Sequence, residues 1–315
     1  MESEYVCSYC GAPLEVTPET IIAICSYCGK PKVISGIVSV EDVYIMPALD
    51  RFSIEKIFKE TIERDFDLRR IKKEIEIHNS VGTYVPIWVS KVHLKGKVSY
   101  YRYKSENKGR KKVYKVEVVD EVRNVPIVAR RQIAPLGTNE LLNLISNREL
   151  SPKRLIDVSV EEWREIKLEV LNTEYDKRSA LERIQEDSLD RLREDFKRRS
   201  DGIDGFQVEV VSLSDPKLLL VPIWRVYYSY KDSVYQIIYA GWNGELLVKT
   251  EPVTVIRRVA YILGSIALIF ITGLATVLLL SRKEVELSSL IFPLFLMGMT
   301  YYTARKIIKG VRLER

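Results

Sequence analysis

The sequence predicts an α+β multidomain protein in three parts: a small cysteine-rich module at residues 1–36, a mixed α+β cytosolic domain at 37–256 and a C-terminal two-helix transmembrane hairpin at 257–315. Three observations predict this division. All four cysteines of the 315-residue chain lie in its first thirty residues, one four-residue motif occurs twice in the middle, and two long apolar runs occupy the end.

The cysteines form two Cys-x-x-Cys pairs, each inside the sequence Cys-Ser-Tyr-Cys-Gly and separated by fourteen residues. The four candidate metal ligands are Cys7, Cys10, Cys25 and Cys28. Four thiolates in a closed tetrahedral shell suit one structural Zn²⁺. Gly11 and Gly29 follow the pairs, where a positive φ turns backbone N–H groups toward the sulfurs. A segment of this length buries too little core to fold alone, so we expect the metal to stabilise it.

Within the module we expect short strands at 14–16, 21–24 and 32–34. Two disulfides are the competing interpretation, but the acidic start of the chain does not resemble a cleavable secretion signal. An iron centre would use the same four ligands. A catalytic zinc is disfavoured because four cysteines leave no open coordination position and neither His78 nor His93 is near them in sequence.

The paired Cys-x-x-Cys-Gly knuckles resemble those of the zinc-ribbon superfamily, over about residues 5–36. The resemblance implies a ligand role for the four cysteines, with Ser8 and Ser26 at the positions where the family often has proline. Members include transcription factors, polymerase subunits and ribosomal proteins, so the resemblance specifies metal binding and not a cellular task. The arrangement also resembles that of uncharacterised archaeal and bacterial membrane proteins with an N-terminal ribbon and C-terminal helices.

The apolar runs at 259–280 and 287–304 contain 22 and 18 residues without a charge. As a helix the first reaches about 33 Å, enough to cross a hydrocarbon core of about 30 Å. The six-residue connector is too short for a domain, so both ends of the chain lie on one side of the bilayer. More basic residues lie at the outer ends of the two apolar runs than in the connector between them. The positive-inside rule therefore predicts a multi-pass cell-membrane protein whose N-terminus, middle domain and C-terminus are cytoplasmic.

The net charge of +6 lies entirely in the membrane part, since residues 1–256 contain forty charges of each sign. A neutral cytosolic part disfavours nucleic acid as the partner. One local basic run, Lys104–Lys115, is expected to be a solvated hairpin loop, with a phosphate or lipid contact as the alternative.

The middle domain contains an internal repeat, because Val85-Pro86-Ile87-Trp88 recurs as Val221-Pro222-Ile223-Trp224. Each copy predicts a β-hairpin, at about 83–119 and 219–248, with turns at Lys95-Gly96 and Lys231-Asp232. We expect the copies to pair in one sheet and their tryptophans to anchor equivalent cores. An exposed aromatic groove for a peptide or lipid is the alternative.

Two helical stretches are predicted in the middle domain, one before the first hairpin and one between the two hairpins. Residues 53–76 predict a helix with Ser53 as N-cap and an apolar face that includes Ile54, Phe58 and Ile62. The stretch at about 160–199 predicts one long charged helix or two, because neither glycine nor proline occurs there and acids precede bases at four-residue spacing. Its apolar line, from Leu181 to Phe196, is expected to lie over the sheet, with a self-associating coiled coil as the alternative.

No motif for catalysis is present: there is no phosphate-binding glycine loop, no His-Glu-x-x-His and no cysteine beyond the four ligands. We therefore expect a non-enzyme: a membrane-anchored zinc protein that holds a protein partner at the lipid bilayer. A nucleic-acid-binding or transcription-linked regulator is the alternative. A pore built by oligomers of the hairpin is disfavoured because the apolar runs contain no charge. The abundance of Lys, Glu and Ile and the scarcity of Gln and His resemble thermophilic archaeal composition.

Overall fold

The computed structural model describes residues 5–14, 16, 22–25, 27–28, 30–34, 40–106, 109–130, 136–148, 150–159, 162, 168–171, 173–252, 255–281, 291–308 and 311–314. The chain forms two compact units. The first contains Met1–Ile57, Ser80–Val226 and Ile238–Leu247, and the second contains Phe58–Asn79, Tyr227–Ile237 and Val248–Arg315.

The N-terminal module of the first unit contains a two-stranded sheet in which β1 (Ile22–Ile24) pairs antiparallel with β2 (Pro31–Val33). The strand expected at 32–34 is therefore present, one residue earlier. The strand expected at 14–16 is not seen at its described residues. Just before it, Val6 and Pro13 form an isolated antiparallel bridge. Glu15 lies outside the described residues.

The large sheet of the first unit centres on β4 (Ile75–Glu106), which pairs with β5 (Gly109–Val128), β7 (Glu169–Val170), β8 (Gly202–Leu213) and β9 (Lys217–Tyr230). The parallel partner of β9 is β3 (Val43–Ile45), and β3 pairs on its other side with β6 (Lys153–Arg154). Two short 3-10 helices, η1 (Val40–Asp42) and η3 (Leu155–Asp157), flank these strands.

The two copies of the repeated motif lie in β4 and β9, which pair with each other, as the repeat predicts. Both tryptophans are buried, and each indole N–H donates to a backbone carbonyl: Trp88 to Tyr175 at 3.0 Å and Trp224 to Leu49 at 3.0 Å. The motif therefore anchors the core, and the exposed aromatic groove is not formed by these side chains.

The first hairpin differs from its prediction. No turn occurs at Lys95-Gly96, since β4 continues to Glu106 and pairs with β5 over its whole outer half. Gly96 instead permits close approach of β8, because a Cβ there would collide with the carbonyl oxygen of Gln207. The predicted basic loop is also mostly strand: Lys104 lies opposite Lys111, and Asn107 and Lys108 lie outside the described residues.

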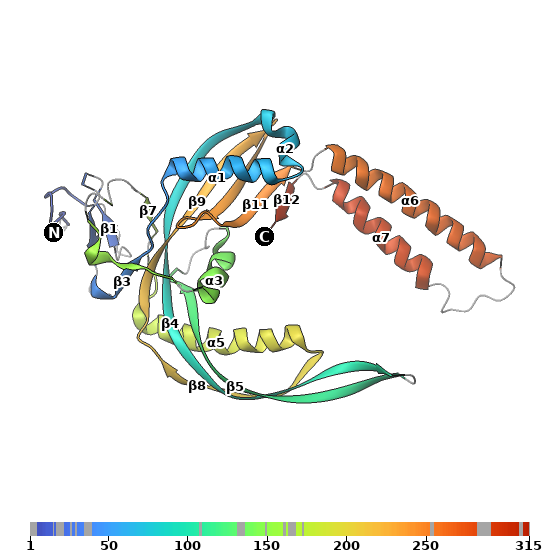
Figure 1. The fold of residues 1–315 in the computed structure, drawn as a ribbon, viewed down its shortest axis with the longest axis horizontal. Coiled ribbons are helices and arrows are strands. Elements are labelled where there is room, and N and C mark those ends of the chain that lie inside the picture. The colour runs from blue at the N-terminus through green and yellow to red at the C-terminus, as the bar shows by residue number, and fades with distance from the viewer. Residues whose placement is uncertain are drawn as a thin grey trace. The chain divides into compact units, whose positions relative to one another are not determined.

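The charged helix is shorter than predicted. The helix α5 runs over Lys177–Arg199, and the Asp176 side chain caps it by accepting from the Ser179 N–H at 2.8 Å. Residues 168–171 and 173–176 are not helical and include β7. The buried side of α5 repeats every four residues, from Ala180 to Phe196, and packs on β5 and β8 (Figure 1). Its apolar side is thus used within the chain, as expected for a helix over the sheet.

A shorter helix, α3 (Thr138–Asn147), also packs on β5. Its buried residues are Thr138, Leu141 and Ile145.

The helix α1 (Arg51–Arg64) begins in the first unit and continues into the second, where Phe58 lies against Tyr228 with ring centroids 5.5 Å apart. The predicted cap was wrong: Asp50 accepts from the Ser53 N–H at 2.6 Å, so the helix begins at Arg51. The predicted single helix to residue 76 is divided into α1, α2 (Leu68–Ile71) and η2 (Lys72–Glu74), since the Asp65 carboxylate accepts from two backbone N–H groups between the helices.

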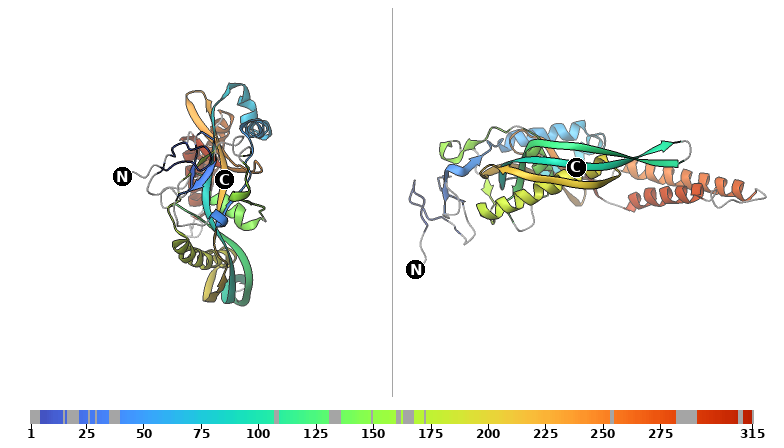
Figure 2. Two further views of the ribbon diagram at one scale, coloured as in Figure 1. Left: turned by 90° about the vertical axis from the view of Figure 1, so that its left-hand side faces the viewer. Right: turned by 90° about the horizontal axis from the view of Figure 1, so that it is seen from below.

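The second repeat copy forms its predicted hairpin. The turn at Lys231-Asp232 has a positive φ at Lys231 and joins β9 to β10 (Ser233–Ala240). Next along the chain is β11 (Leu246–Pro252), which pairs antiparallel with β12 (Val311–Glu314). Two long helices, α6 (Val255–Leu280) and α7 (Ile291–Ile308), follow β11 in sequence and lie side by side (Figure 2).

Candidate metal centre and membrane helix

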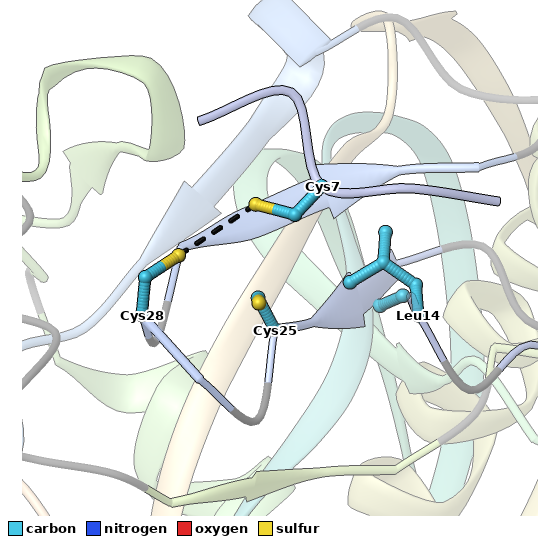
Figure 3. Close-up of a cluster of buried hydrophobic side chains, with 5 residues drawn as sticks. Cys7, Leu14, Cys25 and Cys28 are labelled. Atoms are coloured by element: carbon cyan, nitrogen blue, oxygen red, sulfur yellow. Dashed lines mark hydrogen bonds between the residues drawn. The ribbon is translucent and has the colours of Figure 1, made fainter. Parts of the chain in front are cut away.

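The four cysteines meet at one point. All four sulfur atoms lie within 4.8 Å of one another. The Sγ atoms of Cys7 and Cys28 are 3.6 Å apart (Figure 3). Those of Cys10 and Cys25 are 3.5 Å apart. A tetrahedral ion with metal–sulfur bonds of about 2.3 Å needs sulfur separations of about 3.8 Å, so the set fits one such ion. All four thiols are free, which disagrees with the disulfide alternative.

Backbone geometry of the first knuckle positions its sulfurs. Gly11 adopts a φ of +73°, which lets its N–H donate to the Cys7 carbonyl at 2.9 Å. The Cys7 N–H donates to the Ala12 carbonyl at 2.8 Å, closing the turn. The corresponding Gly29 lies outside the described residues, but the Cys25 N–H donates to the Lys30 carbonyl at 3.1 Å in the equivalent place.

Burial and hydrogen bonds act differently on the individual thiols. Burial opposes ionisation of Cys7, yet N–H groups of Cys10 and Tyr9 outweigh it and lower the pKa of Cys7 to about 6. Burial dominates at Cys28 and raises its pKa to about 12. A divalent cation at the centre would compensate the buried negative charge and deprotonate coordinating thiols outright.

The module's small core consists largely of the ligands themselves. Cys7, Cys25 and Cys28 are buried and pack with Leu14 and Ala23, as Figure 3 shows in part. Lys32 ties the second strand to the N-terminal segment, since its Nζ donates to the Val6 carbonyl at 2.7 Å. With the core so small, removal of an ion would leave few apolar contacts to maintain the module.

The histidines are not brought to this centre: Nε2 of His93 lies 2.6 Å from a carboxylate oxygen of Asp120, on the β4–β5 ladder. Among the described residues, the four cysteines are the one group of three or more metal-binding side chains that come this close together. The ligands that the described part of the chain brings together are thus four thiols, without a histidine or carboxylate, which suits a structural ion and not a catalytic one.

One feature of the knuckles was not predicted from the sequence, namely the exposure of their tyrosines. Tyr9 and Tyr27 occupy the same position in the two Cys-Ser-Tyr-Cys repeats, and they are 56% and 73% exposed. Lys30 lies over the Tyr9 ring, with its Nζ 5.0 Å from the centroid. The repeat itself was the signal, because the residue just before the second cysteine is the same in both knuckles and its ring is exposed in both.

At the other end of the chain, one helix of the described residues is long and apolar enough to cross a membrane: α6, over Val259–Leu279. The predicted second span is not reproduced. Its described helix, α7, covers residues 291–304 of the predicted run, and α6 is the one described helix that is long and apolar enough to span. Residues 287–290 lie outside the described residues.

In α6 and α7 many large apolar side chains are exposed, and one pair of hydroxyls lies between the helices. The Ser265 and Thr303 hydroxyls meet between the helices at 2.9 Å. Thr272 and Thr300 donate to the carbonyls of Leu268 and Leu296 in their own helices. The exposed side chains are large and apolar, namely Leu263 at 62%, Phe270 at 74%, Phe292 at 57% and Leu294 at 64%. Exposed large apolar side chains in this number are unusual for helices that face water.

No protein-family model, curated protein or solved structure matches the chain. The resemblance to zinc ribbons therefore depends on the two knuckles and on the convergence of their four sulfur atoms.

Proposed function

We propose that this chain is a membrane-anchored protein-interaction module in which a zinc ribbon displays two tyrosines to a cytosolic protein partner. The observation that carries the proposal is the contrast between the buried ligands Cys7, Cys25 and Cys28 and the exposed Tyr9 and Tyr27 beside them. Exposed tyrosines on a rigid support supply a large contact area at low conformational-entropy cost. The zinc would be structural, fixing the two rings relative to each other.

Zinc is the metal that we propose, because four thiolates within tetrahedral distance are its common structural ligand set. Iron in the same ligand set is the competing occupant, and it would make the module an electron carrier. The ligands Cys7, Cys10, Cys25 and Cys28 would then be unchanged. Optical absorbance of the purified protein distinguishes the two, since Zn²⁺ has no redox chemistry and a filled d shell.

The anchor would be a hairpin of α6 and α7 in the bilayer. Two facts support this: the outward face of the pair is apolar, and the hydroxyls of Ser265 and Thr303 satisfy each other between the helices. In hydrocarbon, small and hydroxylated residues are preferred at helix–helix contacts. Pro293 lies in the first turn of α7, where a missing N–H costs no helical hydrogen bond. The basic residues flanking the two runs then favour a cytoplasmic N-terminus, middle domain and C-terminus.

The experiment is purification of the full chain from membranes of its source, with co-purifying protein and nucleic acid quantified across a salt series. Wild type is compared with the double variant Tyr9→Ala/Tyr27→Ala and with Phe52→Ala, which removes an aromatic that is 79% exposed elsewhere in the first unit. Zinc content is measured for all three.

We expect a partner protein in stoichiometric amount with wild type and Phe52→Ala, and its loss from the double variant with zinc retained. A partner retained without the two tyrosines would contradict the proposal. Nucleic acid that is released steeply as salt rises would instead favour the regulator alternative, since phosphate contacts depend on counterion release.

A further inference from the structure

The strand β5 has an open edge. Over Gly109–Val128 it pairs with β4, and no other described strand pairs with it. In Figure 2, right, β4 lies between β5 and β8. The side chains of Val116, Val118 and Val122 on β5 are 68%, 68% and 64% exposed. A long edge with apolar side chains and unpaired backbone groups is a template for a further strand.

The charges of this edge are arranged as a mirror about Val116. The sequence from Lys111 to Glu121 reads Lys-Lys-Val-Tyr-Lys-Val-Glu-Val-Val-Asp-Glu. Bases precede the centre and acids follow it at equal distances. If two copies of β5 pair antiparallel with Val116 opposite Val116, opposite charges face each other at every charged position of this stretch. The cross-copy pairs are Lys111 with Glu121, Lys112 with Asp120, and Lys115 with Glu117.

The uncharged positions match as well. Tyr114 would lie opposite Val118, and Val113 opposite Val119, which are aromatic–aliphatic and β-branched cross-strand pairs of the kind that stabilise sheets. Each pair joins residues of the same parity, so both partners project on the same face of the extended sheet, as antiparallel pairing requires. The regular register of β5 with β4 contains no bulge that would disturb this edge.

The neighbouring registers are unfavourable. Centring the pairing on Lys115 places that lysine against its own copy, and centring it on Glu117 places two glutamates together. Lysines on an edge strand usually prevent pairing. Here the mirrored acids permit pairing in one register and disfavour the adjacent ones.

From this self-complementarity we propose that β5 binds β5 of a second copy of the same chain, forming a two-fold symmetric dimer through one continuous sheet. The inference goes beyond the proposed function and does not depend on it, because neither the ribbon nor the membrane helices contribute a residue. The isologous interface repeats each charge pair twice.

Charge-reversal variants test the proposed register. The full chain is kept in detergent, and its protein mass is measured across a dilution series. Lys111→Glu places a glutamate opposite Glu121 at two symmetric positions, so we expect the dimer dissociation constant to rise tenfold or more relative to wild type. The double variant Lys111→Glu/Glu121→Lys restores opposite charges and should recover most of the affinity. Lys91→Glu, on β4 and opposite Asn124, is the control and should dimerise like wild type.

A second measurement, disulfide cross-linking, tests which residues of the two β5 strands lie opposite each other. Directly opposite residues of antiparallel strands have Cα atoms about 5 Å apart, within the reach of a disulfide. Val116→Cys should therefore form a disulfide with its own copy under mild oxidation in the zinc-loaded protein, identified from the linked peptide. Val118→Cys should not, because in this register its two copies lie about 14 Å apart along the strands.

Three results would overturn the inference. They are a monomeric wild type at all concentrations, a dimer that Lys111→Glu leaves unchanged, and a disulfide through Val118→Cys in place of Val116→Cys. A dimer formed by the membrane helices would give the second result.

Discussion

Lys249 in β11 is the centre of a buried ion network in the second unit. Its Nζ contacts a carboxylate oxygen of Asp65 and lies 3.2 Å from one of Glu251. The side chains of Lys249 and Glu251 are 8% and 1% exposed. Lys249→Met keeps most of the aliphatic stem and removes the cation, so two carboxylates lose their shared positive partner.

The expected loss follows from this burial. Removing one partner of a buried pair leaves an uncompensated charge and costs about 3–5 kcal/mol. The matched control is Arg64→Met in the same unit, because Arg64 is 83% exposed and its pair with Glu60 spans 3.5 Å. An exposed pair of this kind contributes less than about 1 kcal/mol.

The assay is hydrogen exchange of peptides that cover β11 and the Asp65 turn, measured on the full chain in detergent. At neutral pH we expect exchange in Lys249→Met to be faster than in wild type by roughly two to four orders of magnitude. A change within about tenfold of that for Arg64→Met would refute the assignment of Lys249 as a stabilising buried cation.

The pH dependence has a definite sign. Burial raises the pKa of Asp65, but Lys249 and the N–H groups of Leu68 and Asp67 together lower it below its ordinary value. Its contribution to stability is therefore present above about pH 3.9 and is lost as pH falls through the lowered pKa. We expect the difference between wild type and Lys249→Met to shrink in acid, since protonated Asp65 no longer needs the cation.

Three further outcomes are expected. Cys25→Ser should release the metal and expose the N-terminal module to protease while residues beyond it stay folded, and unchanged metal content would contradict the site. Trp224→Phe should destabilise by about 1–3 kcal/mol in thermal unfolding, because the part-buried carbonyl of Leu49 loses its indole donor; an unchanged midpoint would argue against this hydrogen bond. Gly96→Ala should disrupt pairing of β4 with β8, measured as faster exchange there, whereas Gly205→Ala should change little because its nearest neighbour is a serine hydroxyl.

Local features of the fold could be predicted from the sequence. The cysteine knuckles and the turn at Lys231-Asp232 are set by a few adjacent residues, and both agree with the structure. The core role of Trp88 and Trp224 was also predicted, because a repeated Val-Pro-Ile-Trp with alternating neighbours favours equivalent buried strands.

Features set by distant residues were predicted wrongly. Gly96 suggested a turn, but it serves the close approach of β8, a strand more than a hundred residues away. One miss was local: the start of α5 was placed too early because no glycine or proline interrupts residues 160–176, although the capping Asp176 directly precedes the helix in sequence. The complementarity of the β5 edge could not be found until the register with β4 placed Lys104–Lys115 in paired strands.

The most direct test of a zinc-stabilised module on a membrane anchor is the metal-to-protein ratio of the chain that stays in the membrane pellet after an alkaline wash. We predict one zinc per chain in that fraction for wild type, and no bound zinc in the Cys25→Ser variant. A chain that the wash removes, or a membrane-bound wild type without zinc, would contradict the account.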